Sequence, residues 1–144
     1  MGLIVNDEDD IERLLRTTKT IAMVGASERP HRPSHGVMRF LQARGYRVIP
    51  VNPTSPDNVI NDEPVVAQLS EITEPVDMVD IFHRSHLAGE DIDAAIAEKD
   101  RLAIKSVWLQ LGVIDEAAAS RAEAAGLEVV MDRCPAIEYP KLIS

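Results

Sequence analysis

Residues 20–36 read TIAMVGASERPHRPSHG, and this stretch indicates the fold. Residues 20–25 form a short run of small and branched apolar side chains, which predicts a buried strand that ends at a glycine. Ser34 is a suitable N-cap for a helix with one apolar face, and Gly45 ends that helix. A buried strand, a glycine turn and a helix N-terminus together form the phosphate-binding unit of many α/β proteins.

The same alternation of apolar runs and helical patterns continues along the chain. Upstream, Asn6 can cap a helix that has acidic residues 7–10 in its first turn and an apolar face. Residues 52–75 contain four of the nine prolines and predict a connection with a short strand or helix near residues 64–69. The further predicted strands are residues 46–51, 76–82, 104–110 and 127–131, and the further predicted helices are residues 85–99 and 115–125.

Near-continuous apolar strands that alternate with helices are typical of a parallel sheet covered on both faces. Right-handed crossovers then make the fold class α/β, a doubly wound, Rossmann-like parallel sheet of about five strands with helices on both faces. A length of 144 residues favours one domain over residues 1–144.

Charge and cysteine content exclude several function classes. The formal net charge of −9 disfavours binding to nucleic acid or to an anionic membrane surface. The single cysteine excludes an intramolecular disulfide, and no segment has the pattern of a signal peptide or a membrane span, so we expect a cytoplasmic protein. Basic residues nevertheless cluster within residues 28–47, where Glu28 is the only acid, and this cluster suggests a small anionic ligand.

The carboxyl ends of the predicted strands identify the ligand-binding edge. In a parallel sheet these ends lie along one edge, and ligands bind there near the point where the strand order reverses. The segments that follow the strands are Gly25-Ala26-Ser27, Asn52-Pro53, Phe82-His83-Arg84, Gln110-Leu111-Gly112 and Asp132-Arg133-Cys134.

The loop after the first strand does not match the dinucleotide-binding fingerprint. That fingerprint needs three closely spaced glycines and an acid after the second strand, whereas this chain has Gly25 alone before Gly36, and Asn52 in place of the acid. The loop still offers a close backbone approach at Gly25, the Ser27 hydroxyl, a helix N-terminus and the Arg32 guanidinium to a phosphate. The alternative is that Gly25 only forms a tight turn and that the serine at the helix start only caps the helix.

Five sequence blocks carry a resemblance to a known family. They are Ile21 to Ser34, Tyr46 to Pro53, Val76 to Phe82, Val107 to Gly112 and Val129 to Cys134. Together they resemble the small stand-alone CoA-binding proteins of bacteria, from about residue 21 to residue 138. These proteins are similar to the CoA-binding domain of the succinyl-CoA synthetase alpha subunit and of the NDP-forming acyl-CoA synthetases.

The resemblance implies coenzyme A or an acyl-CoA as the ligand, with particular residues around it. It implies that the CoA phosphates lie at Gly25, Ala26 and Ser27 and near Arg32 and Ser34. It places Asn52 and Pro53 along the nucleotide, and lets Phe82, Trp108, Leu109 and Gln110 shape the path of adenine and pantetheine. Arg47 and Arg84 are further candidates for phosphate contacts. Ordinary core packing is the alternative for Phe82 and Trp108.

The resemblance implies binding without an assigned catalytic residue. The synthetases that share this domain use a phosphorylated histidine in a following domain, which these 144 residues do not include. Two alternatives remain open: an enzyme or enzyme subunit that acts on an acyl-CoA thioester with a partner chain, and an NAD-binding oxidoreductase or regulator. No residue pattern indicates a metal site.

Cys134 has two interpretations. It follows the last predicted strand, where a helix N-terminus and Arg133 favour a reactive thiol that could form a mixed disulfide with CoA. The alternative is a small, buried and unreactive side chain.

Overall fold

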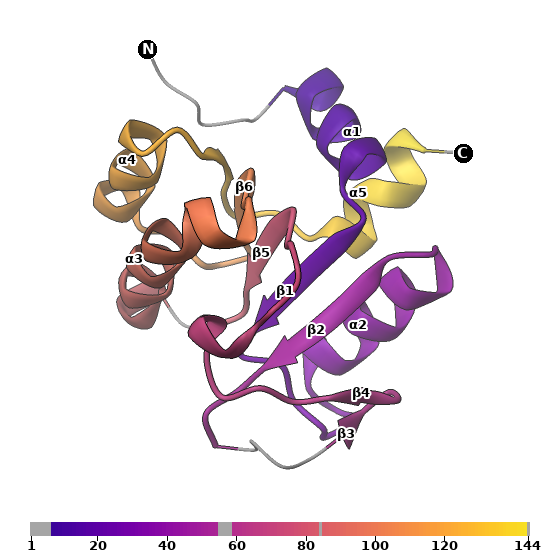
Figure 1. The fold of residues 1–144 in the computed structure, drawn as a ribbon. Helices are drawn as coiled ribbons and strands as arrows, with labels where there is room; N and C mark the ends of the chain where they lie inside the picture. Colours follow the sequence, from indigo (N-terminus) through magenta and orange to yellow (C-terminus); the bar gives the residue numbers. More distant parts are fainter. Residues whose placement is uncertain (1–6, 55–58, 84, 144) are drawn as a thin grey trace.

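The computed structural model describes residues 7–54, 59–83 and 85–143. In this part of the chain, five parallel strands form one sheet in the order β2-β1-β5-β6-β7 (Figure 1). Their bounds are β1 Thr20–Val24, β2 Arg47–Val51, β5 Met78–Ile81, β6 Ser106–Leu109 and β7 Glu128–Val130. The predicted doubly wound, Rossmann-like α/β fold is therefore confirmed.

Helices cover both faces of the sheet (Figure 1). One face packs against α1 Glu8–Thr17, α2 Pro33–Ala43 and α5 Pro135–Leu142, and the other packs against α3 Ser85–Leu102 and α4 Glu116–Ala124. Alternate strand residues serve the two faces, so that Met23 lies in the core under α1 and α2, while Ala22 lies in the core under α3. None of the helices in the described ranges is long and apolar enough to cross a membrane.

Two predicted helix starts differ from the structure. The side chain of Asp7 caps α1 by accepting a hydrogen bond from the N–H of Asp9 at 2.8 Å, and Asn6, which was expected there, lies outside the described residues. The prediction that Ser34 caps α2 is wrong, because the helix begins at Pro33 and Arg32 is the N-cap residue. Proline is favoured at the first helical position, since its φ is already helical and it lacks the N–H that would have no partner there.

The connection between β2 and β5 carries little regular structure, as the prolines predict. It contains a small antiparallel pair, β3 Val59–Ile60 with β4 Glu63–Pro64, and the short 3-10 helix η1 Leu69–Glu71. The N–H of Asn52 donates to the carbonyl of Val66 at 2.9 Å, which ties this connection to the end of β2. The residue after β2 is therefore held in a fixed position beside the loop that follows β1.

The central strand β5 carries a fully buried carboxyl group, Asp80. It lies opposite Met23 on β1 and Trp108 on β6, and neither of its carboxyl oxygens has a hydrogen-bond partner among the described residues. Burial raises the pKa of Asp80 well above its ordinary value of 3.8, because the charged form is poorly solvated there. Residues 76–82 read VDMVDIF, and no local sequence pattern distinguished Asp80 from Asp77 as the buried carboxyl group.

Candidate functional site

The strand order reverses between β1 and β5, and the residues after these strands form the centre of a cleft. Sheet-like hydrogen bonds continue beyond the strand ends and fix these residues. The N–H of Gly25 donates to the Val51 carbonyl at 2.9 Å, and the N–H of Phe82 donates to the Val24 carbonyl at 2.9 Å. The loops that leave the sheet therefore start from fixed backbone positions.

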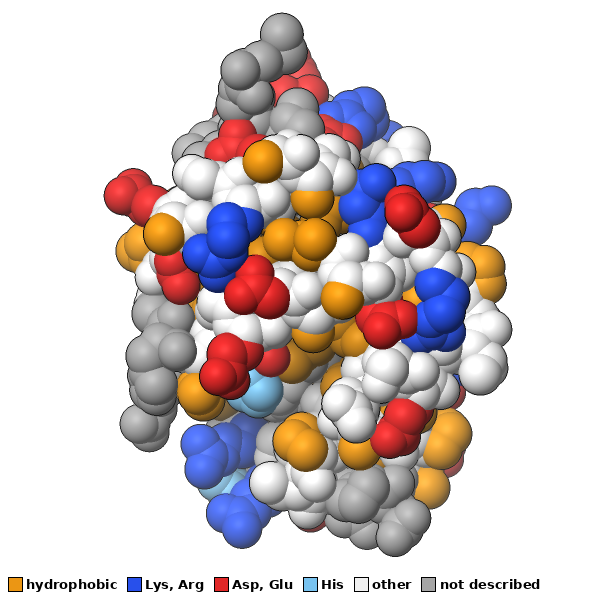
Figure 2. All heavy atoms as spheres, turned by 60° about the vertical axis from the view of Figure 1, so that its left-hand side comes forward, with side chains coloured by type: hydrophobic (Ala, Val, Ile, Leu, Met, Phe, Trp, Pro, Cys, Tyr) orange, Lys and Arg blue, Asp and Glu red, His pale blue; other side chains and the backbone are white. Residues whose placement is uncertain are grey.

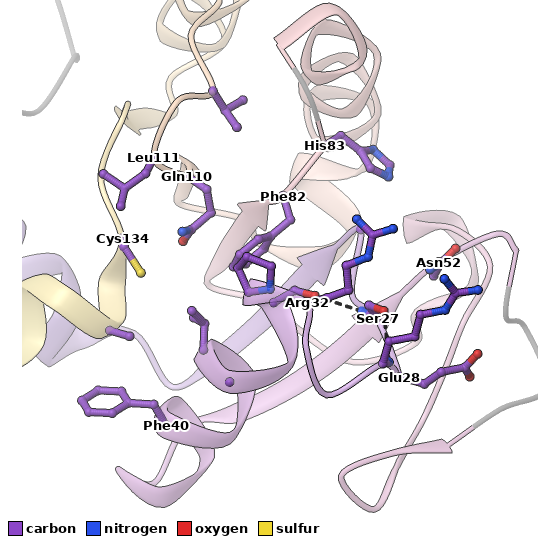
Figure 3. A pocket seen from close by; sticks show the side chains of 18 of the residues that line it. Ser27, Glu28, Arg32, Phe40, Asn52, Phe82, His83, Gln110, Leu111 and Cys134 are labelled. Atoms are coloured by element: carbon purple, nitrogen blue, oxygen red, sulfur yellow. Dashed lines mark hydrogen bonds between the residues drawn. The ribbon is translucent and has the colours of Figure 1, made fainter.

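The cleft has a volume of about 1370 Å³ and opens along the carboxyl edge of the sheet. On the face seen in Figure 2, basic and histidine side chains gather at the lower left, beside a hollow with a hydrophobic floor. Of the residues predicted from the sequence, the following line the cleft: Gly25, Ser27, Arg32, Ser34, Asn52, Pro53, Phe82 and Gln110. Figure 3 shows Ser27, Arg32 and Asn52 on one side and Gln110, Leu111 and Cys134 on the other, with Phe82 between them.

The loop from Gly25 to Ser34 is held by two of its own serine side chains and by Asn52. The N–H of Ser27 donates to the Ser34 hydroxyl at 3.0 Å, and the N–H of Arg29 donates to the Ser27 hydroxyl at 3.1 Å. The Asn52 amide donates to the carbonyl of Ala26 at 2.8 Å. Ser34 is buried, so its hydroxyl positions this loop from the first turn of α2 instead of capping the helix.

Gly25 lies where a side chain would not fit. Its φ is +85°, which L residues rarely adopt. A Cβ at this position would lie 2.9 Å from Cδ2 of His83 and 3.3 Å from Cβ of Phe82. The glycine thus lets the β1 turn and the residues after β5 come close together in the cleft.

Two arginines of the loop carry unbalanced charge. Arg29 and Arg32 line the cleft, and within the described residues neither forms an ion pair. Glu28 also lines the cleft. An Arg without a carboxylate partner can give charge-assisted hydrogen bonds to a bound anion.

Arg47, which the resemblance offered as a further candidate for phosphate contacts, does not belong to this site. It is the first residue of β2, at the opposite edge of the sheet, and its guanidinium contacts Glu74 at 2.5 Å and Glu63 at 3.2 Å. The helix between the two strands carries the chain back across the sheet, which separates Arg47 from the loop arginines in space.

His83 is a cleft residue for which the sequence indicated no specific role. Its Nδ1 lies 2.6 Å from the Asp91 carboxylate on α3. This hydrogen bond and the charge of Asp91 raise the pKa of His83 from its ordinary value of 6.5, although partial burial acts in the opposite direction. The sequence placed His83 after β5, but only the fold brings Asp91 to its ring.

Besides Arg47, four predicted residues do not line the cleft with described side chains. Ala26 is buried in the core, and Trp108 and Leu109 are fully buried within β6. The indole N–H of Trp108 donates to the Arg133 carbonyl at 2.7 Å, so its polar atom serves the chain after β7. Arg84 lies outside the described residues.

The far side of the cleft is largely apolar. Its lining comes from α2, from the segment after β6 and from the start of α5: Val37, Phe40, Leu111, Val113, Cys134, Ala136 and Ile137. These residues are separated along the chain, and only their convergence at one edge reveals a continuous surface. Among the described side chains no three His, Cys, Asp or Glu residues group as metal ligands would.

Known proteins share this sequence and fold. A family model described as CoA binding domain matches residues 19–140. The uncharacterized protein YneT of Bacillus subtilis is 37% identical over 125 residues, which cover 87% of this chain and 88% of YneT. A hypothetical protein of Pyrococcus horikoshii OT3 has a TM-score of 0.90 and 30% identity, and the match covers 100% of this chain and 97% of that chain.

One structural neighbour is a large enzyme. The dinucleotide-forming acetyl-coenzyme A synthetase 1 of Candidatus Korarchaeum cryptofilum has a TM-score of 0.71 and 24% identity. The match covers 86% of this chain and 28% of that chain, and at this identity the likeness concerns the fold alone.

Proposed function

Because the chain belongs to the CoA-binding domain family, we propose that it binds coenzyme A or an acyl-CoA in the cleft at the carboxyl edge of its sheet. The observation that carries this proposal is the pair of loop arginines, Arg29 and Arg32, that line the cleft without a carboxylate partner among the described residues. They lie at the strand-order reversal, where α/β sheets bind nucleotides.

The chemistry of this side of the cleft suits the phosphates of CoA. CoA has a pyrophosphate and a ribose 3′-phosphate, which need cations and N–H donors. Arg32 is the N-cap residue of α2, so the partial positive charge of the helix N-terminus adds to that of the arginines. Asn52 follows β2 where NAD-binding proteins have an acid, so no carboxylate repels a phosphate at that position.

The remaining lining supports an orientation for the ligand. In the proposed orientation the nucleotide lies toward Asn52, Pro53 and Thr54, and the phosphates lie at the loop arginines and His83. The pantetheine arm then passes Phe82 and reaches Gln110. The buried Trp108 and Leu109 act through the shape of β6 and not by direct contact.

Calorimetric titration tests this proposal. CoA is expected to bind more tightly than NAD or AMP, and Arg32→Ala should weaken CoA binding roughly 10- to 100-fold because a charge-assisted hydrogen bond is lost. The matched control is Arg47→Ala, which removes an arginine at the opposite edge and should leave the affinity unchanged. If CoA binds no better than NAD and AMP, the proposal that CoA is the ligand is wrong. Equal losses of CoA affinity in Arg32→Ala and Arg47→Ala would mean that the loop is not the phosphate-binding site.

A further inference from the structure

Cys134 is placed between the sheet and α5, at the apolar side of the cleft. It is the only cysteine of the chain and the N-cap residue of α5, and its side chain makes no capping hydrogen bond. Only 5% of the residue is exposed, yet it lines the cleft. Its thiol is therefore shielded from general reagents but adjacent to the space that a ligand would fill.

Gln110 provides an independent indication of a ligand at the same place. The residue is 6% exposed, and its Oε1 has no hydrogen-bond partner among the described residues. Its side chain extends into the cleft between Phe82 and Cys134 (Figure 3). A buried amide oxygen without a partner is costly, and a ligand with an amide group can satisfy it after a small adjustment.

The order of the strands gives the spacing between the loop and the thiol. The Gly25 loop follows β1, and Cys134 follows β7, with β5 and β6 between them. Neighbouring strands lie about 4.8 Å apart, so roughly 14 Å of sheet edge separates the two ends of the cleft. An extended pantetheine arm, with two amides and a terminal thiol, can reach across three such strand spacings.

We propose that Cys134 is a thiol-disulfide exchange site for the thiol end of the bound ligand. The inference rests on the proposed CoA site. The Cys134 thiolate attacks one sulfur of a CoA disulfide, a bond forms between Sγ and that sulfur, and the disulfide bond breaks. The second CoA leaves as a thiolate and takes up the proton that Cys134 gave up. No further oxidant is needed, and a small thiol reverses the step.

Selectivity follows from the two ends of the cleft. The loop arginines hold the phosphates and thereby raise the effective concentration of the disulfide near Cys134. Glutathione disulfide lacks these phosphates and meets a shielded thiol. We therefore expect CoA disulfide to react at least about tenfold faster than glutathione disulfide at equal concentration.

Intact-mass spectrometry of the full chain tests the inference. Incubation with CoA disulfide should add the mass of one CoA less two hydrogens, dithiothreitol should remove it, and Cys134→Ser should not acquire it. Arg32→Ala should slow the reaction with CoA disulfide and leave the reaction with glutathione disulfide unchanged. Gln110→Leu should also slow only the CoA reaction, because the pantetheine amide loses its partner.

Two outcomes overturn the inference: no adduct on the folded wild-type chain, or equal rates with the two disulfides. Titration of the wild-type chain with CoA under reducing conditions separates this failure from that of the proposed function. If reduced CoA binds and no adduct forms, only the exchange site is wrong. If reduced CoA does not bind, the proposed CoA site itself is wrong.

Discussion

The two edges of the same sheet use their charged residues differently. At the amino edge, where the amino ends of the strands lie, charges are paired. Arg47 contacts Glu63 and Glu74, and Arg13 contacts Glu128 at the start of β7. Asp77, before β5, accepts hydrogen bonds from the N–H groups of Lys19 and Thr20 at 2.9 and 3.1 Å. At the carboxyl edge, His83 and Arg133 contact Asp91 and Glu138, but Arg29 and Arg32 form no such pair within the described ranges.

The difference between the edges separates stability from binding. Paired surface charges are already neutralised by their partners in the free protein, and their net contribution to stability is small. Unpaired arginines that gather at a cleft repel each other in the free protein and gain energy only when an anion binds. The unpaired arginines at the carboxyl edge are therefore suited to binding an anionic ligand, whereas the paired charges at the amino edge are not.

The sharpest test of this comparison uses one glycine from each edge. Gly25 and Gly45 both have positive φ, +85° and +94°, so alanine at either position should cost about 1–2 kcal/mol of stability. Only Gly25 also has His83 and Phe82 within contact distance of a new Cβ. Gly25→Ala should weaken CoA binding by about 2–3 kcal/mol, or roughly 30- to 150-fold, because the loop moves away from the phosphates.

Gly45→Ala is the control for that experiment. Nothing lies within 4 Å of its new Cβ, so the CoA affinity should stay at the wild-type value although the stability falls. Urea unfolding gives the two stabilities and calorimetry gives the two affinities. An equal fall in affinity for both variants would contradict the assignment of binding to the carboxyl edge.

The second prediction contrasts two carboxyl groups, Asp80 inside the sheet and Asp77 at its amino edge. The pKa of Asp80 is raised in the folded state, so the stability contributed by its neutral form is full below pH 3.8 and is lost as the pH rises toward the folded value. Asp80→Asn should therefore be more stable than wild type by about 1–3 kcal/mol at pH 7, and the difference should vanish near pH 4.

Asp77→Asn should behave in the opposite way at pH 7. It replaces a carboxylate that accepts two backbone N–H groups, and it should lower the stability. Urea unfolding at pH 4 and pH 7 measures both variants. If Asp80→Asn is less stable than wild type at pH 7, its carboxyl group has a favourable partner and the contrast with the amino edge is wrong.

Much of the fold could be predicted because its signals are local. Runs such as residues 48–51 are apolar without interruption, as strands buried on both faces require, and Gly126 marks the end of α4. The strand ends also identified the cleft in outline, since parallel strands bring them to one edge. Ser34 was placed wrongly because proline at the first helical position outweighed a serine cap.

Other features of the site depend on how the fold places residues that are far apart in the sequence, which no local sequence pattern predicts. Arg32 and Arg47 belong to one basic cluster in the sequence, but α2 carries the chain from one edge of the sheet to the other between them. His83 gains its hydrogen bond only when α3 folds over the edge and brings Asp91 close. Trp108 lies within β6 and does not reach the cleft, whereas Gln110 follows the last residue of the strand and lines the cleft.

The third prediction concerns pH at the carboxyl edge. The raised pKa of His83 means that its ring carries a positive charge up to a pH above 6.5 and loses it as the pH rises further. CoA affinity should fall about 3- to 10-fold between pH 6 and pH 8.5 as this charge is lost. Ionisation of the ligand's 3′-phosphate near pH 6 acts in the opposite direction.

Two variants isolate the contribution of His83. His83→Gln should remove the fall in affinity and leave only the effect of the ligand. Asp91→Asn should move the fall to lower pH, since the hydrogen bond to Asp91 is the largest cause of the raised pKa. Calorimetry at several pH values measures these changes, and an unchanged profile in His83→Gln would exclude His83 from the phosphate site.

The smallest expected effect lies at the amino edge. Arg47 contacts two glutamates at short distance, but its side chain is 46% exposed, so water and salt screen both ion pairs. Arg47→Ala should lower the free energy of unfolding by no more than about 1 kcal/mol, and less at high salt. Arg32→Ala, which removes an unpaired charge beside Arg29, should leave the stability unchanged or raise it slightly. Urea unfolding at low and high salt measures both variants. A larger loss in Arg32→Ala than in Arg47→Ala would mean that the loop arginines stabilise the free protein, and the separation between the two edges would then fail.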